Sequence, residues 1–254
     1  MITVSELVKG LEAFAPLDLA CSWDNSGLQV GWKNAPVEKV LVALDPFEDT
    51  IREAISLGAQ MLVTHHPLLF TPAKQITDDT AVGRSIALLM EHHISLWSGH
   101  TNVDIAQGGV NDVLAERLGL RDVRPLPPEN LLRIGTVKEQ TLEDFLRTVK
   151  QWLGCPGLRY VDAGRTCKKI AVGGGACGSE LELAVEAGCD TFVTGDVKYN
   201  QFRDSLDSGM NLIDAGHFWT ENPVCTALAA KLQSAFPDLV VQISEKQGDC
   251  MKFF

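Results

Sequence analysis

Residues 39–66 read KVLVALDPFEDTIREAISLGAQMLVTHH, and residues 169–196 read KIAVGGGACGSELELAVEAGCDTFVTGD. The two segments align without a gap at an offset of 130, and 6 of 28 positions are identical. Each holds an apolar run, a loop, a helical stretch closed by a glycine (Gly58 or Gly188) and a second apolar run. This pattern is typical of a strand–helix–strand unit with parallel strands.

A second match lies farther along each half. Residues 99–104 and 216–221 both follow an apolar run, and both read Gly-His-x-x-x-acid. Strand–helix–strand order is common to all α/β chains, but shared chemistry at the third strand end favours a duplication. We therefore predict an α/β protein of two similar duplicated domains, each with three layers and a mixed sheet built on βαβ units.

The prolines of residues 121–129 mark the best candidate for a linker between the halves. They predict a first α/β half over residues 1–124 and a second over residues 125–254. A late helix over 220–236 and a final strand over 238–244 could pack back on the first half. Other apolar patterns predict helices over 5–14, 80–93, 109–119 and 141–153, and a strand near 132–137.

Composition excludes several classes of protein. The chain has 254 residues, 45% of them hydrophobic, and a formal charge of −11. Such an acidic chain without a basic run argues against nucleic acid as a partner. It also has no apolar stretch of about 18 residues that could cross a membrane. Its seven irregularly spaced cysteines, and a start unlike a signal peptide, predict a reducing, cytoplasmic setting.

The six histidines are concentrated at the ends of predicted strands. His65 and His66 follow one apolar run directly, and His100 and His217 follow the third run of each half. Ligands of open α/β sheets gather outside the carboxyl ends of the strands. The other two histidines, at 92–93, fall at the solvated end of a predicted helix. The four strand-end imidazoles therefore predict a metal site.

The spacing of these residues suggests two ions. Consecutive residues leaving a strand point in opposite directions, so His65 and His66 would serve different ions. If the segments after His100 and His217 are helical, Asp104 and Glu221 share a helix face with them. Each segment then offers one imidazole and one carboxylate, and either carboxylate could bridge two cations.

Imidazole and carboxylate ligands suit two divalent ions of Zn, Fe, Mn or Ni, and the sequence does not choose among them. The protein ligands are too few to close two coordination shells, so water or substrate must complete them. That arrangement is typical of a catalytic site in which a bridging water is the nucleophile.

Three weaker features have two interpretations each. The glycine-rich run 173–178 would cradle an anion or form a tight turn. The loop 23–28, which begins with Trp23, would border the site or pack against the protein. Asp196 and Lys198 would support the site or belong to a solvated loop.

The chain resembles the Nif-three-like proteins, which are often labelled GTP cyclohydrolase I type two. The resemblance covers essentially the whole chain, and its carriers are residues 23–31, 64–67, 100–104, 194–196 and 216–221. It implies two similar α/β domains with a dinuclear metal centre in the cleft between them. It also implies a homohexameric ring, of which this chain would be the compact form, without an inserted domain.

The resemblance also implies a set of ligands. The matching positions are His65, His66, Asp104, His217 and Glu221, with Glu221 as the bridge. His100 matches a histidine near the metals, as a further ligand or as a catalytic proton donor.

Two classes of function follow. The first is a metal-dependent hydrolase acting on a nucleotide-like small molecule, either a GTP cyclohydrolase or a phosphohydrolase. The second is a non-catalytic, metal-bound, ring-shaped scaffold or adaptor. Turnover after metal reconstitution separates them.

Overall fold

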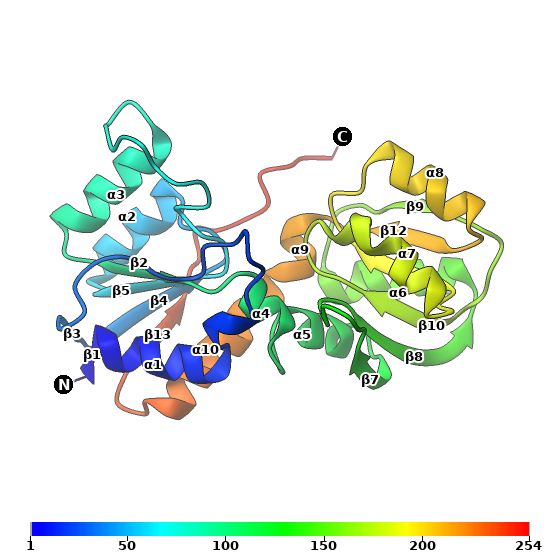
Figure 1. The fold of residues 1–254 in the computed structure, drawn as a ribbon, viewed down its shortest axis with the longest axis horizontal. Coiled ribbons are helices and arrows are strands. Elements are labelled where there is room, and N and C mark those ends of the chain that lie inside the picture. The colour runs from blue at the N-terminus through cyan, green and yellow to red at the C-terminus, as the bar shows by residue number, and fades with distance from the viewer. Residues whose placement is uncertain (1, 254) are drawn as a thin grey trace. The chain divides into compact units, whose positions relative to one another are not determined.

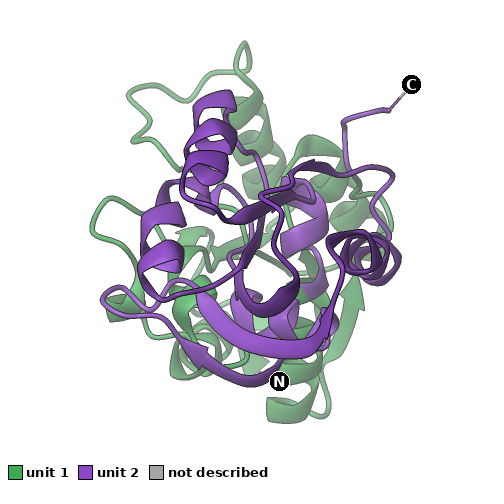
Figure 2. Ribbon diagram, turned by 90° about the vertical axis from the view of Figure 1, so that its right-hand side faces the viewer, with its two compact units in different colours: residues 1–109, 224–248 green, residues 110–223, 249–254 purple. Residues whose placement is uncertain are grey.

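The protein is described from a computed structural model that covers residues 2–253. By its internal contacts the chain divides into two compact units, coloured separately in Figure 2. Unit 1 holds residues 1–109 and 224–248, and unit 2 holds residues 110–223 and 249–254. The chain thus leaves unit 1, forms unit 2 and returns.

Unit 1 is built on a five-stranded sheet of order β13-β4-β5-β6-β2. Strands β4 (Lys39–Ala43), β5 (Met61–Thr64), β6 (Ser95–Ser98) and β13 (Val240–Ile243) are parallel, and β2 (Gly27–Val30) runs antiparallel to β6. Figure 1 shows β13, from the red end of the chain, beside the blue β4. Strands β1 (Ile2–Thr3) and β3 (Pro36–Val37) form a separate antiparallel pair.

Helices cover both faces of this sheet. Helices α2 (Glu48–Leu57) and α3 (Ala81–Glu91) lie on one side, and α1 (Val4–Phe14) and α10 (Pro223–Ala235) lie on the other (Figure 1). Leu41, Leu62 and Leu96 of the strands pack against Ile51 and Leu89 of α2 and α3. Because side chains alternate along a strand, Val40 and Val42 point to the opposite face. The short helices η1 (Leu17–Leu19) and α4 (Thr101–Ile105) complete the unit.

Unit 2 has a six-stranded sheet of order β7-β8-β10-β11-β12-β9. Strands β10 (Cys167–Val172), β11 (Thr191–Thr194) and β12 (Asn211–Asp214) are parallel. Strands β8 (Arg133–Gln140) and β9 (Arg159–Val161) run antiparallel at either side of them, and β7 (Arg121–Pro125) pairs antiparallel with β8.

The two faces of the unit 2 sheet carry separate apolar clusters. Helices α5 (Val110–Arg117) and α6 (Leu142–Leu153) pack on Ile170, Val193 and Ile213. On the other face α7 (Leu181–Glu186) and α8 (Tyr199–Asp207) pack on Phe192 and Leu212. The short helices η2 (Cys177–Glu180) and α9 (His217–Glu221) lie in the loops that follow β10 and β12.

The strand register confirms the internal repeat. Val40 faces Met61 in unit 1, and Ile170 faces Thr191 in unit 2. Both pairs are related by the offset of 130 found in the sequence. Both βαβ units therefore have the same strand pairing, as a duplication predicts.

The structure differs from the sequence prediction at the junction of the halves. The expected boundary followed residue 124, but α5 and β7 belong to unit 2, which starts at Val110. Residues 121–125 of the expected linker form the edge strand β7, whose exposed side chains conceal its strand character from a hydrophobic pattern. The late helix is two helices, α9 and α10, and α10 and β13 pack in unit 1.

Among residues 2–253, no helix has the length and apolar character needed to span a membrane. The seven cysteines, all in this part of the chain, are present as thiols, and Cys155, Cys167, Cys177, Cys189 and Cys225 are buried.

Candidate metal centre

Three imidazoles of unit 1 lie together at the carboxyl ends of β5 and β6. His65 and His66 directly follow β5, and His100 lies two residues after β6. The ring of His65 is 5.0 Å from that of His66 and 5.4 Å from that of His100, measured between centroids. Adjacent parallel strands end at the same edge of a sheet, and this places the three side chains together.

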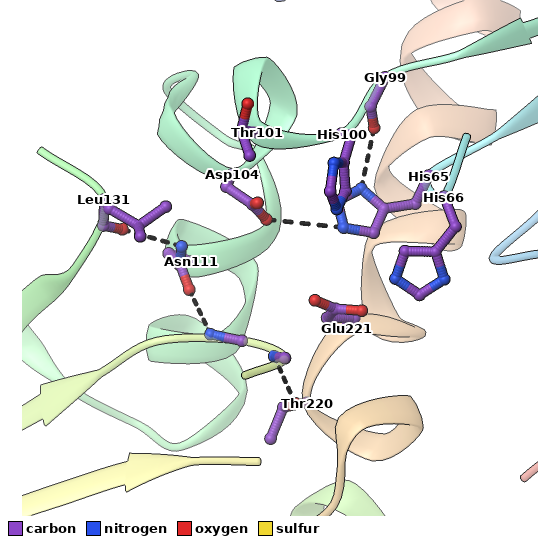
Figure 3. A network of polar contacts seen from close by, with 12 residues as sticks. His65, His66, Gly99, His100, Thr101, Asp104, Asn111, Leu131, Thr220 and Glu221 are labelled. Carbon is purple, nitrogen blue, oxygen red and sulfur yellow. Dashed lines mark hydrogen bonds and ion pairs between the residues drawn. The ribbon is translucent and has the colours of Figure 1, made fainter. Parts of the chain in front are cut away.

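Each of these rings has its Nδ1 held by an oxygen acceptor. His65 Nδ1 donates to the Gly99 carbonyl at 2.8 Å, as Figure 3 shows. His66 Nδ1 donates to Asp45 at 2.7 Å, and His100 Nδ1 donates to Asp24 at 2.8 Å. Because these oxygens accept, each ring carries its proton on Nδ1 and leaves the Nε2 lone pair available to a metal ion or a proton.

Asp104 brings a carboxylate to the same cluster. It lies in α4, is buried, and places Oδ1 3.6 Å from His65 Nε2 (Figure 3). One ligand atom from each of His65, His66 and His100 also lies within 4.8 Å of the others, which is close enough to share an ion. Unit 1 therefore presents imidazole nitrogens and a carboxylate oxygen in one place, a donor set that suits a divalent transition metal.

Asp24 is the anionic partner of His100. Burial alone would raise its pKa, but hydrogen bonds from His100 and Thr101 outweigh burial and hold the pKa well below its usual value. The Thr101 amide donates to Asp24 at 3.0 Å, and the Thr101 hydroxyl donates at 2.6 Å. Asp24 is therefore ionised at neutral pH and orients the His100 ring through Nδ1.

Unit 2 carries a candidate ligand pair, His217 and Glu221, on α9. His217 Nε2 lies 3.0 Å from Glu221 Oε2, as expected for residues four apart on one face of a helix. His217 Nδ1 donates to Asp196 at 2.8 Å, so this ring is oriented in the same way as those of unit 1. Glu221 is 4% exposed, and a carboxylate so buried needs a cationic partner.

The two Gly-His-x-x-x-acid segments enter their helices differently. His217 is the first residue inside α9, whereas His100 is the N-cap of α4, with a non-helical φ of −105° and ψ of −109°. The segments enter their helices one residue out of step. Helical i,i+4 geometry therefore joins His217 to Glu221, while His100 pairs with Asp24 and Asp104 approaches His65.

The glycine-rich run 173–178 makes room for the side chain of Glu221 and does not form an anion-binding loop. The Gly174 amide donates to Asn111 at 2.7 Å, and the Gly175 amide donates to Thr220 at 3.0 Å (Figure 3). These internal acceptors take up the two amides that a phosphate would need. A Cβ on Gly175, whose φ is +64°, would overlap Glu221 Oε1 and lie 3.1 Å from His217 Nε2. The run is therefore a tight turn that leaves room for the ligand pair.

Sequence reasoning missed part of the support around the imidazoles. Asp45, which orients His66, lies two residues after the end of β4. The rule that places ligands at strand ends predicted the histidines and could also have predicted Asp45. Asp24 lies in a loop far away in sequence, and no local pattern links it to His100. Of the two uncertain residues, Asp196 contacts His217, whereas Lys198 is the N-cap of α8.

Comparison with known proteins identifies the family of the chain. The family described as Duf34/NIF3 (NGG1p interacting factor 3) matches residues 2–249. The chain belongs to this family. A relative from Clostridium perfringens, named GTP cyclohydrolase 1 type 2 homolog, is 36% identical over 98% of this chain and 99% of its own length.

Solved structures of family members share the fold. A Bacillus cereus protein related to NIF3 is 26% identical, with a TM-score of 0.94 over 100% of this chain and 99% of its own. Reduced HcgD from Methanocaldococcus jannaschii is 32% identical, with a TM-score of 0.86 over 96% of this chain and 98% of its own. The duplicated α/β fold predicted from the repeat is therefore the fold of the family.

Proposed function

We propose that this NIF3 family protein is a metal-dependent hydrolase that acts on a nucleotide-like substrate, of the GTP cyclohydrolase type. The residues that would hold two divalent ions are His65, His66, Asp104, His217 and Glu221, of which Glu221 would be the shared ligand. The names of curated relatives support the reaction class. The chemistry of the histidines supports the metal centre.

The orientation of the imidazoles carries the proposal. In metal sites a ligating histidine donates its other ring N–H to a carboxylate or a backbone carbonyl. His65, His66 and His217 all do so, at 2.7–2.8 Å. Histidines that served only as core or surface residues would have no common reason for this arrangement.

Both units offer the same kinds of ligand atom. Asp104 adds a carboxylate to the imidazoles of unit 1, and unit 2 offers the imidazole of His217 and the carboxylate of Glu221. We propose that these residues take ions of Zn, Fe, Mn or Ni. Positions that the protein ligands leave open would take water and substrate, as in catalytic sites.

When bound, two divalent ions supply Lewis acidity and an activated water. The chain itself supplies the proton transfer through His100. Asp24 accepts from His100 Nδ1 and stabilises the imidazolium, so Nε2 can take a proton and return it to the leaving group. The ionised Asp24 also fixes the tautomer that presents Nε2 to the substrate.

Turnover of GTP by metal-reconstituted protein tests this function. The wild type should hydrolyse GTP, and Glu221→Gln should abolish turnover because the bridging charge is lost. His100→Gln should keep its metal and lower kcat by about 10²–10⁴-fold, the usual contribution of an acid–base group. A fully metal-loaded wild type without turnover of any nucleotide would contradict the proposal and favour the scaffold or adaptor function.

We also propose that the protein acts as a homohexamer in the cytoplasm. Cysteines kept as thiols support a reducing compartment. Light scattering should give the mass of six 27.6-kDa chains. A monomeric mass at micromolar concentration would contradict the hexamer without affecting the proposed metal centre.

A further inference from the structure

Two large aromatic side chains lie exposed beside His100 in unit 1. Trp23 is 61% exposed and Phe70 is 51% exposed. Their ring centroids are 5.9 Å apart at an interplanar angle of 66°. The His100 ring lies 6.2 Å from Trp23 and 6.0 Å from Phe70. Trp23 and Phe70 thus form a contiguous apolar surface of the kind that ligands use.

The loops that carry these rings are tied together. Asn25 Nδ2 donates to the Leu69 carbonyl at 2.6 Å, and the Leu69 amide donates to Gln29 Oε1 at 2.9 Å. Gln29 Nε2 in turn donates to the Asn25 carbonyl at 2.6 Å. Leu69 immediately precedes Phe70, and Asn25 lies two residues after Trp23. The rings are therefore held by a hydrogen-bonded scaffold, and this lowers the entropic cost of binding a ligand.

The ring geometry selects the kind of ligand. Trp23 and Phe70 meet each other and His100 edge to face, and each remains more than half exposed, so aromatic surface stays open to solvent. The rings of Trp23 and Phe70 carry no positive charge that would bind a phosphate group. A neutral planar ring suits this surface better than an anion, because it can stack on an aromatic side chain.

We propose that Trp23 and Phe70 form a stacking subsite for the planar heteroaromatic ring of the substrate. The role as a substrate subsite rests on the proposed function. The subsite places the ring beside His100, the proposed proton-transfer group, and leaves the phosphates to other parts of the site. Trp23 and Phe70 are thus specificity-determining residues that select a nucleobase.

Binding of two simple probes tests the subsite. Inosine carries a purine base without phosphate, and inorganic tripolyphosphate carries the charge without a base. NMR-detected titrations would compare the wild type with Trp23→Ala, Phe70→Ala and Trp23→Phe. Trp152, which is 57% exposed on α6, provides the matched control Trp152→Ala.

Both alanine variants at the subsite should bind inosine about ten-fold or more weakly, since stacking on an aromatic side chain contributes that much per base. Trp23→Phe should restore most of the affinity, and Trp152→Ala should not change it. The affinity for tripolyphosphate and the metal content should stay at wild-type levels in every variant.

Three results would overturn the proposal. One is unchanged inosine affinity in both alanine variants, and another is a wild type that does not bind inosine. The third is a Trp23→Ala variant that changes its oligomeric state but not its inosine affinity, which would assign the pair to contacts between copies. If instead chelator-treated wild type binds inosine in a Trp23-dependent manner while no metal can be loaded, the stacking subsite stands and the proposed hydrolase falls.

Discussion

Replacing Gly175 with alanine should damage the ligand pair of unit 2 more than it damages the fold. Gly175 has a φ of +64°, and an added Cβ would overlap Glu221 Oε1 and lie 3.0 Å from its Cδ. Gly188→Ala is the matched control. Its φ is +71°, but the nearest atom to its Cβ would be Lys169 Nζ, at an ordinary 3.8 Å. Both variants share the backbone strain, and only Gly175→Ala adds a clash at the site.

The magnitudes follow from these two costs. A non-glycine residue in the left-handed region costs about 1–2 kcal/mol, part of which is offset because alanine restricts the unfolded chain by about 0.4–1 kcal/mol. Gly188→Ala should therefore lose about 1 kcal/mol. Overpacking adds about 1–3 kcal/mol, so Gly175→Ala should lose about 2–4 kcal/mol. For a chain of this size, about 2–4 °C in Tm accompanies each kcal/mol.

Thermal unfolding with and without metal measures both effects. Metal that binds only the folded protein raises the free energy of unfolding, and therefore Tm. The gain is about 4 kcal/mol when the metal concentration is 1,000 times Kd. The wild type and Gly188→Ala should show this rise, and Gly175→Ala should show little or none. Equal metal-induced shifts in the two glycine variants would refute the inference that Gly175 makes room for a ligating Glu221.

Two further predictions concern single side chains. Asp45→Asn should weaken metal binding about 10–100-fold without unfolding the protein, because the carboxylate that orients His66 is lost; equal affinity by competition with a chelator would contradict this. Burial raises the pKa of the Cys189 thiol to about 11, so little of its thiolate is present at about pH 8. Iodoacetamide should therefore react with the exposed Cys250 and leave Cys189 unmodified. Mass spectrometry of the native protein after iodoacetamide treatment checks it, and rapid labelling of Cys189 would count against it.

The repeat could be predicted from the sequence because its two copies keep the same strand and helix pattern without a gap. The gathering of His65 and His66 with His100 followed from one topological rule, since adjacent parallel strands end together. Both inferences use only patterns along the sequence and do not depend on contacts between distant residues.

The remaining details depend on such contacts. Whether His100 enters the helix or caps it is decided by φ and ψ at one residue, and the motif is the same in both cases. Strands β2 and β9 are short and only partly buried, so hydrophobic periodicity did not reveal them. The hydrogen bonds between Asn25, Gln29 and Leu69 join two loops, and no spacing along the chain encodes them.

The two units also differ at two equivalent positions of the repeat. Only unit 1 has polar side chains at these two positions. At the offset of 130, Asp45 corresponds to Gly175 and His65 to Gly195. A Cβ on Gly195 would lie 2.8 Å from the His217 amide nitrogen. Unit 1 thus places side chains at its strand ends, while unit 2 keeps these positions small so that α9 can approach.

The most direct test of the proposed dinuclear centre is metal content per chain. Elemental mass spectrometry would compare the wild type with His65→Ala, both purified without chelator and without metal-affinity resin. The account predicts about two ions per wild-type chain and a clear loss in the variant, because His65 is a proposed ligand beside Asp104. A wild type that holds no metal and cannot be reconstituted with Zn, Fe, Mn or Ni would contradict it.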